Sequence, residues 1–170
     1  MCQFGRCDAR LRASVMKRKP TVRVPSPSTA FWDTSGIVPL CCFQPQTAHA
    51  RRTARAYPRP VTWWATAVEA ISSFHRLLRE QALTAAGCQQ ALSRLEYLRR
   101  RWNEIQPSDE VREGAERLLG VHKLRAADAL QLSAALVWCS RKPHGRHFIG
   151  ADGDLSKAAE AEGFTMVRLL

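Results

Sequence analysis

The stretch FWDTSGIVPL, residues 31–40, places Asp33 between a short apolar segment and a longer one. The residues before Asp33 are typical of the end of a buried strand, and those after it are typical of a helix start. An acid at this junction has two interpretations. Its carboxylate caps the helix that follows, or it is held at a strand end to bind a metal ion. The stretch alone supports both.

Outward from Asp33, short apolar segments alternate with helical patterns. The strands are expected over residues 30–33, 61–62, 102–106, 147–151 and 165–169. The helices are expected over residues 66–81, 84–101, 109–119, 126–139 and 155–162, with one or two more over 35–56. Pro58 and Pro60 should end the earlier helices, and Ser108 should cap the helix that begins at Asp109. This alternation predicts an α/β fold with a central, mostly parallel sheet.

Residues 1–29 differ from the rest of the chain. They hold seven Lys or Arg and a single acid, and they end in a stretch rich in Pro and Ser that favours neither helix nor strand. We therefore expect a flexible basic leader over residues 1–29 and one folded domain over residues 30–170. Met16, which precedes three basic residues, is an alternative translation start to Met1.

Composition excludes several classes of protein. No apolar run is long enough to span a membrane, and the N-terminal residues lack the apolar core of a secretory signal, so we expect a cytoplasmic protein. The six cysteines form no CxxC pair, which argues against a zinc site and a disulfide framework. The formal net charge of +11 suits a polyanionic partner but is by itself a weak signal.

Four acids stand out by their positions. Asp33 ends one expected strand and Asp152 follows another, and the carboxyl ends of parallel strands are where such sheets bind ligands. Glu69 and Asp128 lie among small and apolar residues, where an ionised acid is costly unless it is paired or bound to a metal. Ion pairs remain an alternative explanation, between Glu69 and Arg76 or His75, and between Asp128 and Arg125.

Clustered carboxylates raise one another's pKa, and a divalent cation makes the cluster tolerable. Oxygen ligands without Cys or His favour Mg²⁺ or Mn²⁺ over zinc. A cation held in this way orients a phosphodiester, activates a water and neutralises charge in the transition state. The four acids therefore suggest a metal-dependent phosphodiesterase.

Taken together and in order, four segments of the chain resemble the PIN-domain ribonucleases, specifically toxins of the VapC type. The segments are WDTSGIVPL (32–40), TAVEAISSFHRLLRE (66–80), LRAADALQLSAAL (124–136) and FIGADGDLSKAAEAEGF (148–164). The resemblance covers residues 31–170. It implies a PIN-like three-layer α/β/α fold and an endoribonuclease dependent on Mg²⁺ or Mn²⁺ that leaves a 5′-phosphate and a 3′-hydroxyl. It also implies inhibition by a cognate antitoxin, and homodimers are common in the family.

The family's catalytic and metal-binding acids fall on Asp33, Glu69, Asp128 and Asp152. Asp154 lies two residues beyond Asp152 and is an alternative fourth acid, although we expect it to cap the last helix instead. Thr34 or Ser35 matches a hydroxyl that helps to orient the metal's surroundings, and a simple helix-capping role is equally consistent with either. Gly36 stands where the family often has alanine.

Contacts to RNA are less clearly marked. Two basic clusters, Arg51, Arg52, Arg55 and Arg59, and Arg99 to Arg101, are typical of solvated helix faces as much as of an RNA surface. Trp63, Trp64 and Trp102 could stack on bases, but their apolar neighbours favour the core or an antitoxin-facing groove. The alternative function is a catalytically inactive PIN-fold module that binds an antitoxin or RNA.

Overall fold

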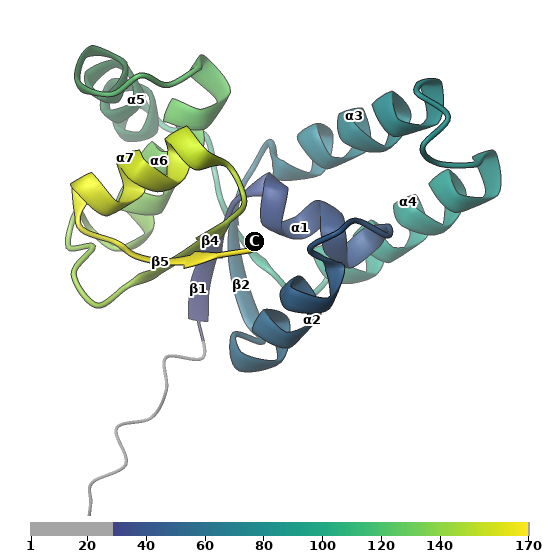
Figure 1. Cartoon of the computed structure of the whole chain (residues 1–170). Helices are drawn as coiled ribbons and strands as arrows, with labels where there is room; N and C mark the ends of the chain where they lie inside the picture. The colour runs from purple at the N-terminus through teal and green to yellow at the C-terminus, as the bar shows by residue number, and fades with distance from the viewer. Residues whose placement is uncertain (1–28, 170) are drawn as a thin grey trace, which may run out of the picture.

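A parallel sheet forms the middle layer of the molecule (Figure 1). Its strands are β1 (Thr29–Trp32), β2 (Arg59–Trp63), β3 (Asn103–Ile105), β4 (His147–Gly150) and β5 (Thr165–Arg168). The computed structural model describes residues 29–169, and within them every strand pair is parallel, in the order β3-β2-β1-β4-β5. The expected parallel sheet is confirmed. The leader and the question of Met1 or Met16 lie outside the described residues, apart from Thr29, which begins β1.

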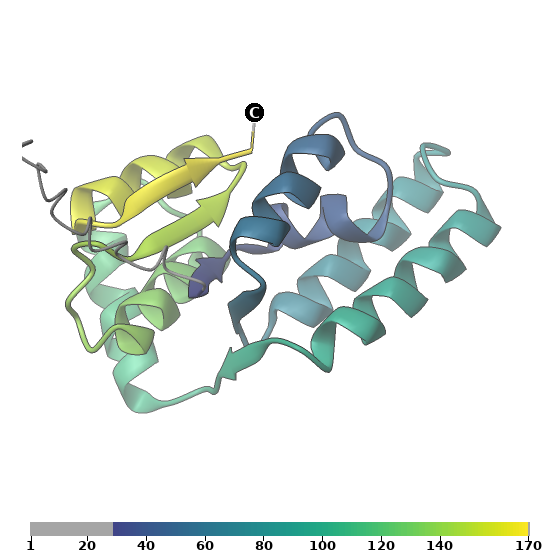
Figure 2. The same ribbon diagram turned by 90° about the horizontal axis from the view of Figure 1, so that it is seen from below.

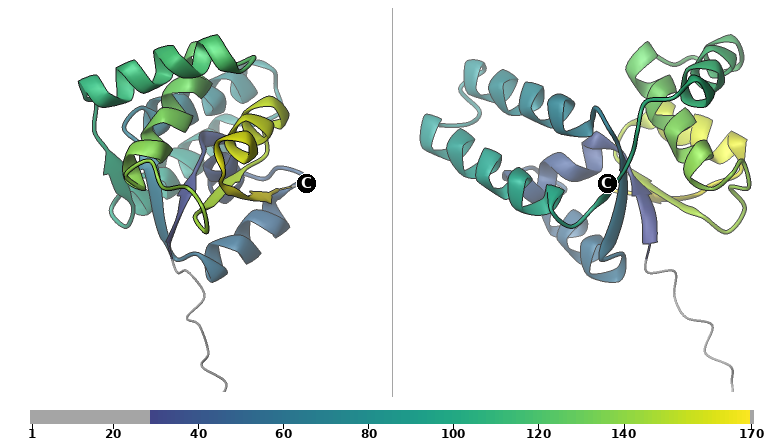
Figure 3. Two further views of the ribbon diagram at one scale, coloured as in Figure 1. Left: turned by 90° about the vertical axis from the view of Figure 1, so that its left-hand side faces the viewer. Right: turned by 180° about the vertical axis from the view of Figure 1, so that it is seen from behind.

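Helices cover both faces of this sheet, as the views in Figure 3 show. One face carries α1 (Thr34–Cys41), α2 (Thr47–Ala56), α3 (Thr66–Arg79) and α4 (Ala85–Arg99). The other face carries α5 (Asp109–Val121), α6 (Ala126–Trp138) and α7 (Gly153–Glu162). The three-layer α/β/α arrangement expected from the resemblance is therefore present.

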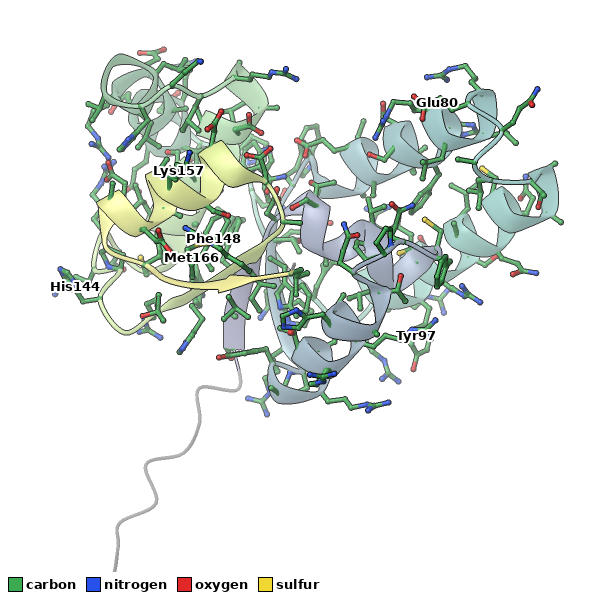
Figure 4. The ribbon with its side chains drawn as sticks, in the orientation of Figure 1. Glu80, Tyr97, His144, Phe148, Lys157 and Met166 are labelled. Atoms are coloured by element: carbon green, nitrogen blue, oxygen red, sulfur yellow. The ribbon has the colours of Figure 1, made fainter. Side chains whose placement is uncertain are left out.

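Alternate residues of β1, β4 and β5 belong to two separate cores. Phe31 packs on Phe148 with a ring-centroid distance of 5.3 Å and belongs to the core under α5, α6 and α7. Met166 of β5 packs against this core, and Figure 4 shows both Phe148 and Met166 beneath α7. Trp32, the next residue of β1, points to the opposite face and lies in the core with α1 to α4. This alternation is the period of two that strands impose.

On the face that carries α1 to α4, α3 and α4 lie side by side and extend away from the sheet, which Figure 2 shows from below. The chain between α1 and α2 divides the segment expected to form one or two helices into two. Ser108 caps α5 as expected, because its hydroxyl accepts a hydrogen bond from the Val111 amide at 3.3 Å. No helix in the described part of the chain is both long and apolar enough to cross a membrane.

One expectation about proline was wrong. Pro60 does not precede the second strand but lies inside β2, where it pairs with Ala30 of β1. The ladder between β2 and β3 begins only at Val61, so β2 has no partner on that side at Pro60. A residue without an N–H is tolerated at such an edge position.

Candidate active site

Asp33 lies at the junction of β1 and α1, at the carboxyl edge of the sheet. Its side chain is only 5% exposed. It caps α1, because Oδ2 accepts hydrogen bonds from the Ser35 amide at 3.1 Å and from the Ser35 hydroxyl. The capping interpretation is therefore correct. It does not exclude the other one, because a cap needs only one carboxylate oxygen.

Glu69 lies in the first turn of α3 and is held by two neighbours. Oε2 of Glu69 accepts a hydrogen bond from the Thr34 hydroxyl at 2.5 Å and another from Nε2 of Gln131 at 2.7 Å. Gln131 also donates to the Thr34 hydroxyl at 2.6 Å. The alternative ion pairs are not present, because Glu69 makes none within residues 29–169 and Arg76 pairs with Glu80 instead.

Gln131 also belongs to the site, although its residue type and neighbours did not predict it. It is 1% exposed, and its second amide atom, Oε1, is buried without a hydrogen-bond partner among the described residues. Its position three residues after Asp128 on α6 places both side chains on the same helix face. That spacing is the signal that could have identified it.

Asp128 and Asp152 border a pocket of about 630 Å³. Asp128 belongs to the first turn of α6, and Asp152 follows β4. Lys123, Arg125 and Asp154 also line the pocket, so two basic groups and a third acid stand near Asp128 and Asp152. Arg125 makes no ion pair with Asp128 within 4.0 Å, although its backbone hydrogen bond and its charge lower the pKa of that acid.

The expectation that Asp154 caps the last helix was wrong. Asp152 is the cap, and its Oδ1 accepts a hydrogen bond from the Leu155 amide at 2.8 Å. The helix begins two residues earlier than expected, so Asp154 already lies in its first turn. There it is exposed and lies 3.8 Å from the ammonium of Lys157.

Burial, with repulsion from neighbouring acids, raises the pKa of Asp33, Glu69 and Asp128. Burial raises the pKa of Asp33 to about 7, with a further rise from Glu69, against the lowering effect of Ser35. Burial also raises the pKa of Glu69, and Asp128 adds to that rise. The pKa of Asp128 is raised by burial and then by Asp152. The four acids are thus successive electrostatic neighbours.

Both hydroxyl residues after Asp33 contact the acids. Thr34 bonds Glu69, as described above, and the Ser35 hydroxyl binds Asp33 while accepting the Ala151 amide at 2.7 Å. Ser35 therefore links the chain after β1 to the chain after β4. Gly150 makes room here, since a Cβ at that position would lie 3.2 Å from Oδ2 of Asp33. Gly36 is explained likewise, because its Cβ would lie 3.2 Å from the Trp32 ring.

The donor chemistry of this site suits a hard divalent cation, because the candidate ligands are carboxylates. Three of the acids are held through one oxygen each, Oδ2 of Asp33, Oε2 of Glu69 and Oδ1 of Asp152. The second carboxylate oxygen of each of these acids takes part in none of these hydrogen bonds. Within residues 29–169, however, no three acids, histidines or cysteines are close enough to hold a metal ion as they stand. Coordination would require the acids to draw together.

The other residues considered as RNA contacts lie away from this site or are buried in the core. Trp63 and Trp102 are buried, whereas Trp64 is half exposed. Arg99 and Arg100 have acidic partners in Glu104 and Glu96, as expected of a solvated helix face. The cluster on α2 and at the start of β2 lies at the amino end of the strands, opposite the acids (Figure 1). It comprises Arg51, Arg52, Arg55 and Arg59.

The sequence matches no protein-family model and no curated protein. Similar structures do exist. One is a chain of a toxin–antitoxin complex from Klebsiella pneumoniae, with 19% identity and a TM-score of 0.53 over 83% of this chain and 98% of that one. Another is VapC20 of Mycobacterium tuberculosis, a sarcin–ricin loop cleaving toxin, with 20% identity and a TM-score of 0.58 over 82% of this chain and 98% of that one. The PIN-like fold expected from the resemblance to VapC-type toxins is confirmed.

Proposed function

We propose that this chain is an endoribonuclease toxin of a type II toxin–antitoxin system and that it depends on Mg²⁺ or Mn²⁺. One observation carries the proposal. Asp33, Glu69, Asp128 and Asp152 are electrostatic neighbours at the carboxyl edge of the sheet, in a fold shared with a toxin that cleaves the sarcin–ricin loop. Such a cluster suits RNA hydrolysis assisted by a divalent cation.

These four acids would hold the cation, which when bound would activate a water and neutralise charge on the phosphodiester. The protein's own contribution is to orient the ligands. Thr34 and Gln131 fix Oε2 of Glu69, and Ser35 fixes Oδ2 of Asp33. Each carboxylate is thereby presented in one orientation, which is the role of hydrogen bonds around a metal ligand.

The test is cleavage of RNA by the purified protein with and without divalent cations. We expect cleavage with Mg²⁺ or Mn²⁺, none with chelator, and none by Asp33→Asn. Asp109→Asn is the matched control, because it removes an exposed carboxylate of α5 that pairs with Arg112 and does not line the pocket of Asp128 and Asp152. Full activity of Asp33→Asn at equal protein concentration would rule out the mechanism.

A second candidate function is a catalytically inactive PIN-fold module that binds an antitoxin or RNA. It is favoured by the spacing of the acids, since no three of them within residues 29–169 stand ready to share a cation. Calorimetric titration with Mn²⁺ at neutral pH separates the two functions. Heat of binding that disappears in Asp33→Asn supports the nuclease, and absence of binding by the wild type supports the module.

The proposed partners are an RNA substrate, a cognate antitoxin and a second copy of the chain, in the cytoplasm. The similar Klebsiella chain belongs to a toxin–antitoxin complex, which supports the antitoxin. An open reading frame found directly upstream would be the candidate. Its product should copurify with this chain and abolish RNA cleavage, and sedimentation of the chain alone would establish whether it dimerises.

A further inference from the structure

A smaller pocket adjoins the candidate site from the side of α1 and α3. Its volume is about 230 Å³, and it lies between α1, the chain that joins α1 to α2, and α3. Thr34 and Ser35, which bond to Glu69 and Asp33, form part of its wall. The pocket is therefore separated from two of the acids by a single layer of side chains.

The polar side chains of this pocket include hydrogen-bond donors and carry no negative charge. Its lining includes Gln46, Ser73 and Arg76, and no acid among the described residues. The hydroxyl protons of Thr34 and Ser35 are already donated to carboxylates. The side chains of Gln46 and Ser73 take part in none of the hydrogen bonds found within residues 29–169, so their donors are available to a ligand.

Arg76 supplies the pocket's positive charge and is only weakly committed elsewhere. Its guanidinium lies 3.7 Å from Glu80, one turn further along α3, and the two side chains are 60% and 53% exposed. Figure 4 shows Glu80 at the far end of α3. An exposed pair of this kind contributes little, so Arg76 can turn toward an anion at small cost.

The volume of the pocket limits the size of the anion that it can bind. The pocket holds the volume of roughly eight waters at about 30 Å³ each, which is below the usual range for pockets that enclose a whole organic ligand. One cation with neutral amide and hydroxyl donors is the set that recognises a phosphate group. A single phosphate with part of its sugar fits this space.

We propose that this pocket binds a backbone phosphate of RNA next to the phosphate that is cut, with Arg76 as its charged contact and Gln46 and Ser73 as its neutral donors. The assignment rests on the proposed nuclease function, because it takes its ligand from the adjoining acids. In this assignment, the RNA that flanks the cut phosphate binds on the side of the site formed by α1 and α3.

The test measures binding of a short, labelled single-stranded RNA by fluorescence anisotropy at several salt concentrations. All proteins carry Asp33→Asn, so the RNA stays intact. Arg76→Ala is compared with Arg79→Ala, which removes the same charge from an exposed residue of α3 outside the pocket. We expect Arg76→Ala to weaken binding about tenfold and to lower the slope of log Kd against log salt by about 0.7, as for one lost phosphate contact. Arg79→Ala should change Kd less than about twofold.

Equal affinities and equal salt slopes for Arg76→Ala and Arg79→Ala would overturn the assignment. So would unchanged RNA binding by Arg76→Ala together with weaker binding of a Glu-rich peptide, which would make the pocket a peptide site. In the active background, Arg76→Ala should raise KM and leave kcat nearly unchanged. Metal-dependent cleavage that Arg76→Ala does not affect would contradict the phosphate pocket and support the nuclease function. Weaker RNA binding by Arg76→Ala, in a protein that cleaves no RNA, would support the pocket and contradict the nuclease function.

Discussion

Asp33 and Glu69, the inner pair, are enclosed by hydrogen-bonded side chains, whereas Asp128 and Asp152, the outer pair, border a pocket with basic residues on its rim. The inner pair is oriented by Ser35, and by Thr34 with Gln131. Within residues 29–169, the outer side chains are held by backbone groups alone, Asp152 by its cap of α7 and Asp128 by a hydrogen bond from Arg125. The comparison suggests a division of labour. The inner pair fixes the orientation of the site's carboxylates, and its burial lowers the stability of the fold. The outer pair contacts substrate and solvent.

The largest effect is expected from the charge of the inner pair. Asp33→Asn should reduce RNA cleavage by at least about a hundredfold, since even partners of metal ligands contribute 10- to 100-fold. Asn remains an adequate helix cap, so the protein should fold, and at neutral pH it should melt at a higher temperature than the metal-free wild type. Cleavage rates and thermal melts of the same samples check both statements. A variant that is less active and also less stable would contradict the division of labour.

The pH dependence of stability follows from the same residue. The pKa of Asp33 is about 7 in the folded protein, above the ordinary value of 3.8. Its favourable contribution is therefore complete below about pH 4 and is lost as pH rises through about 7, a loss on the order of 4 kcal/mol. Burial shifts the pKa of Glu69 in the same direction. Denaturation of metal-free protein between pH 4 and 8 measures this loss, and the curve for Asp33→Asn should be much flatter.

Gln131→Leu probes the orientation of the inner pair without touching an acid. The substitution removes hydrogen bonds to Thr34 and Glu69 and should cost about 1–3 kcal/mol of unfolding free energy. RNA cleavage should fall about 10- to 100-fold. Gln90→Leu on the exposed face of α4 is the control and should change neither quantity appreciably. Activity retained by a destabilised Gln131→Leu would reduce Gln131 to a packing role.

The smallest stability effects belong to the outer pair. Asp152→Asn keeps the cap of α7, so its stability should match the wild type, whereas Asp152→Ala should lose about 1 kcal/mol. Both should lose activity to the same extent, because both remove the charge. Asp154→Asn should retain most of the activity. If Asp154→Asn were the inactive variant instead, Asp154 would take the place of Asp152 in the site.

The sequence predicted the architecture well because its signals are local. Strand ends before Asp33 and Asp152, the cap at Ser108 and the parallel sheet all follow from short patterns of apolar, polar and capping residues. Pro60 was misplaced because only the register of three strands shows that β2 lacks a partner there.

What escaped prediction depends on contacts between distant segments. Gln131 touches Thr34, 97 residues earlier in the chain, and apart from its spacing of three residues from Asp128 it resembles a solvated glutamine. The choice between Asp152 and Asp154 as cap turns on where α7 begins, and two acids in DGD give almost the same signal. The role of Gly150 appears only when Asp33 is placed beside it.

Two of the acids, Asp33 and Asp152, serve as helix caps and as candidate ligands at once. Asparagine caps a helix as well as aspartate does. A single-base change converts either aspartate codon into an asparagine codon. If the protein arrests growth, a cell can therefore escape it in one mutational step and still produce a folded, full-length chain. Selection of survivors after induced expression should yield Asn at positions 33 and 152, in soluble protein, alongside the usual truncations.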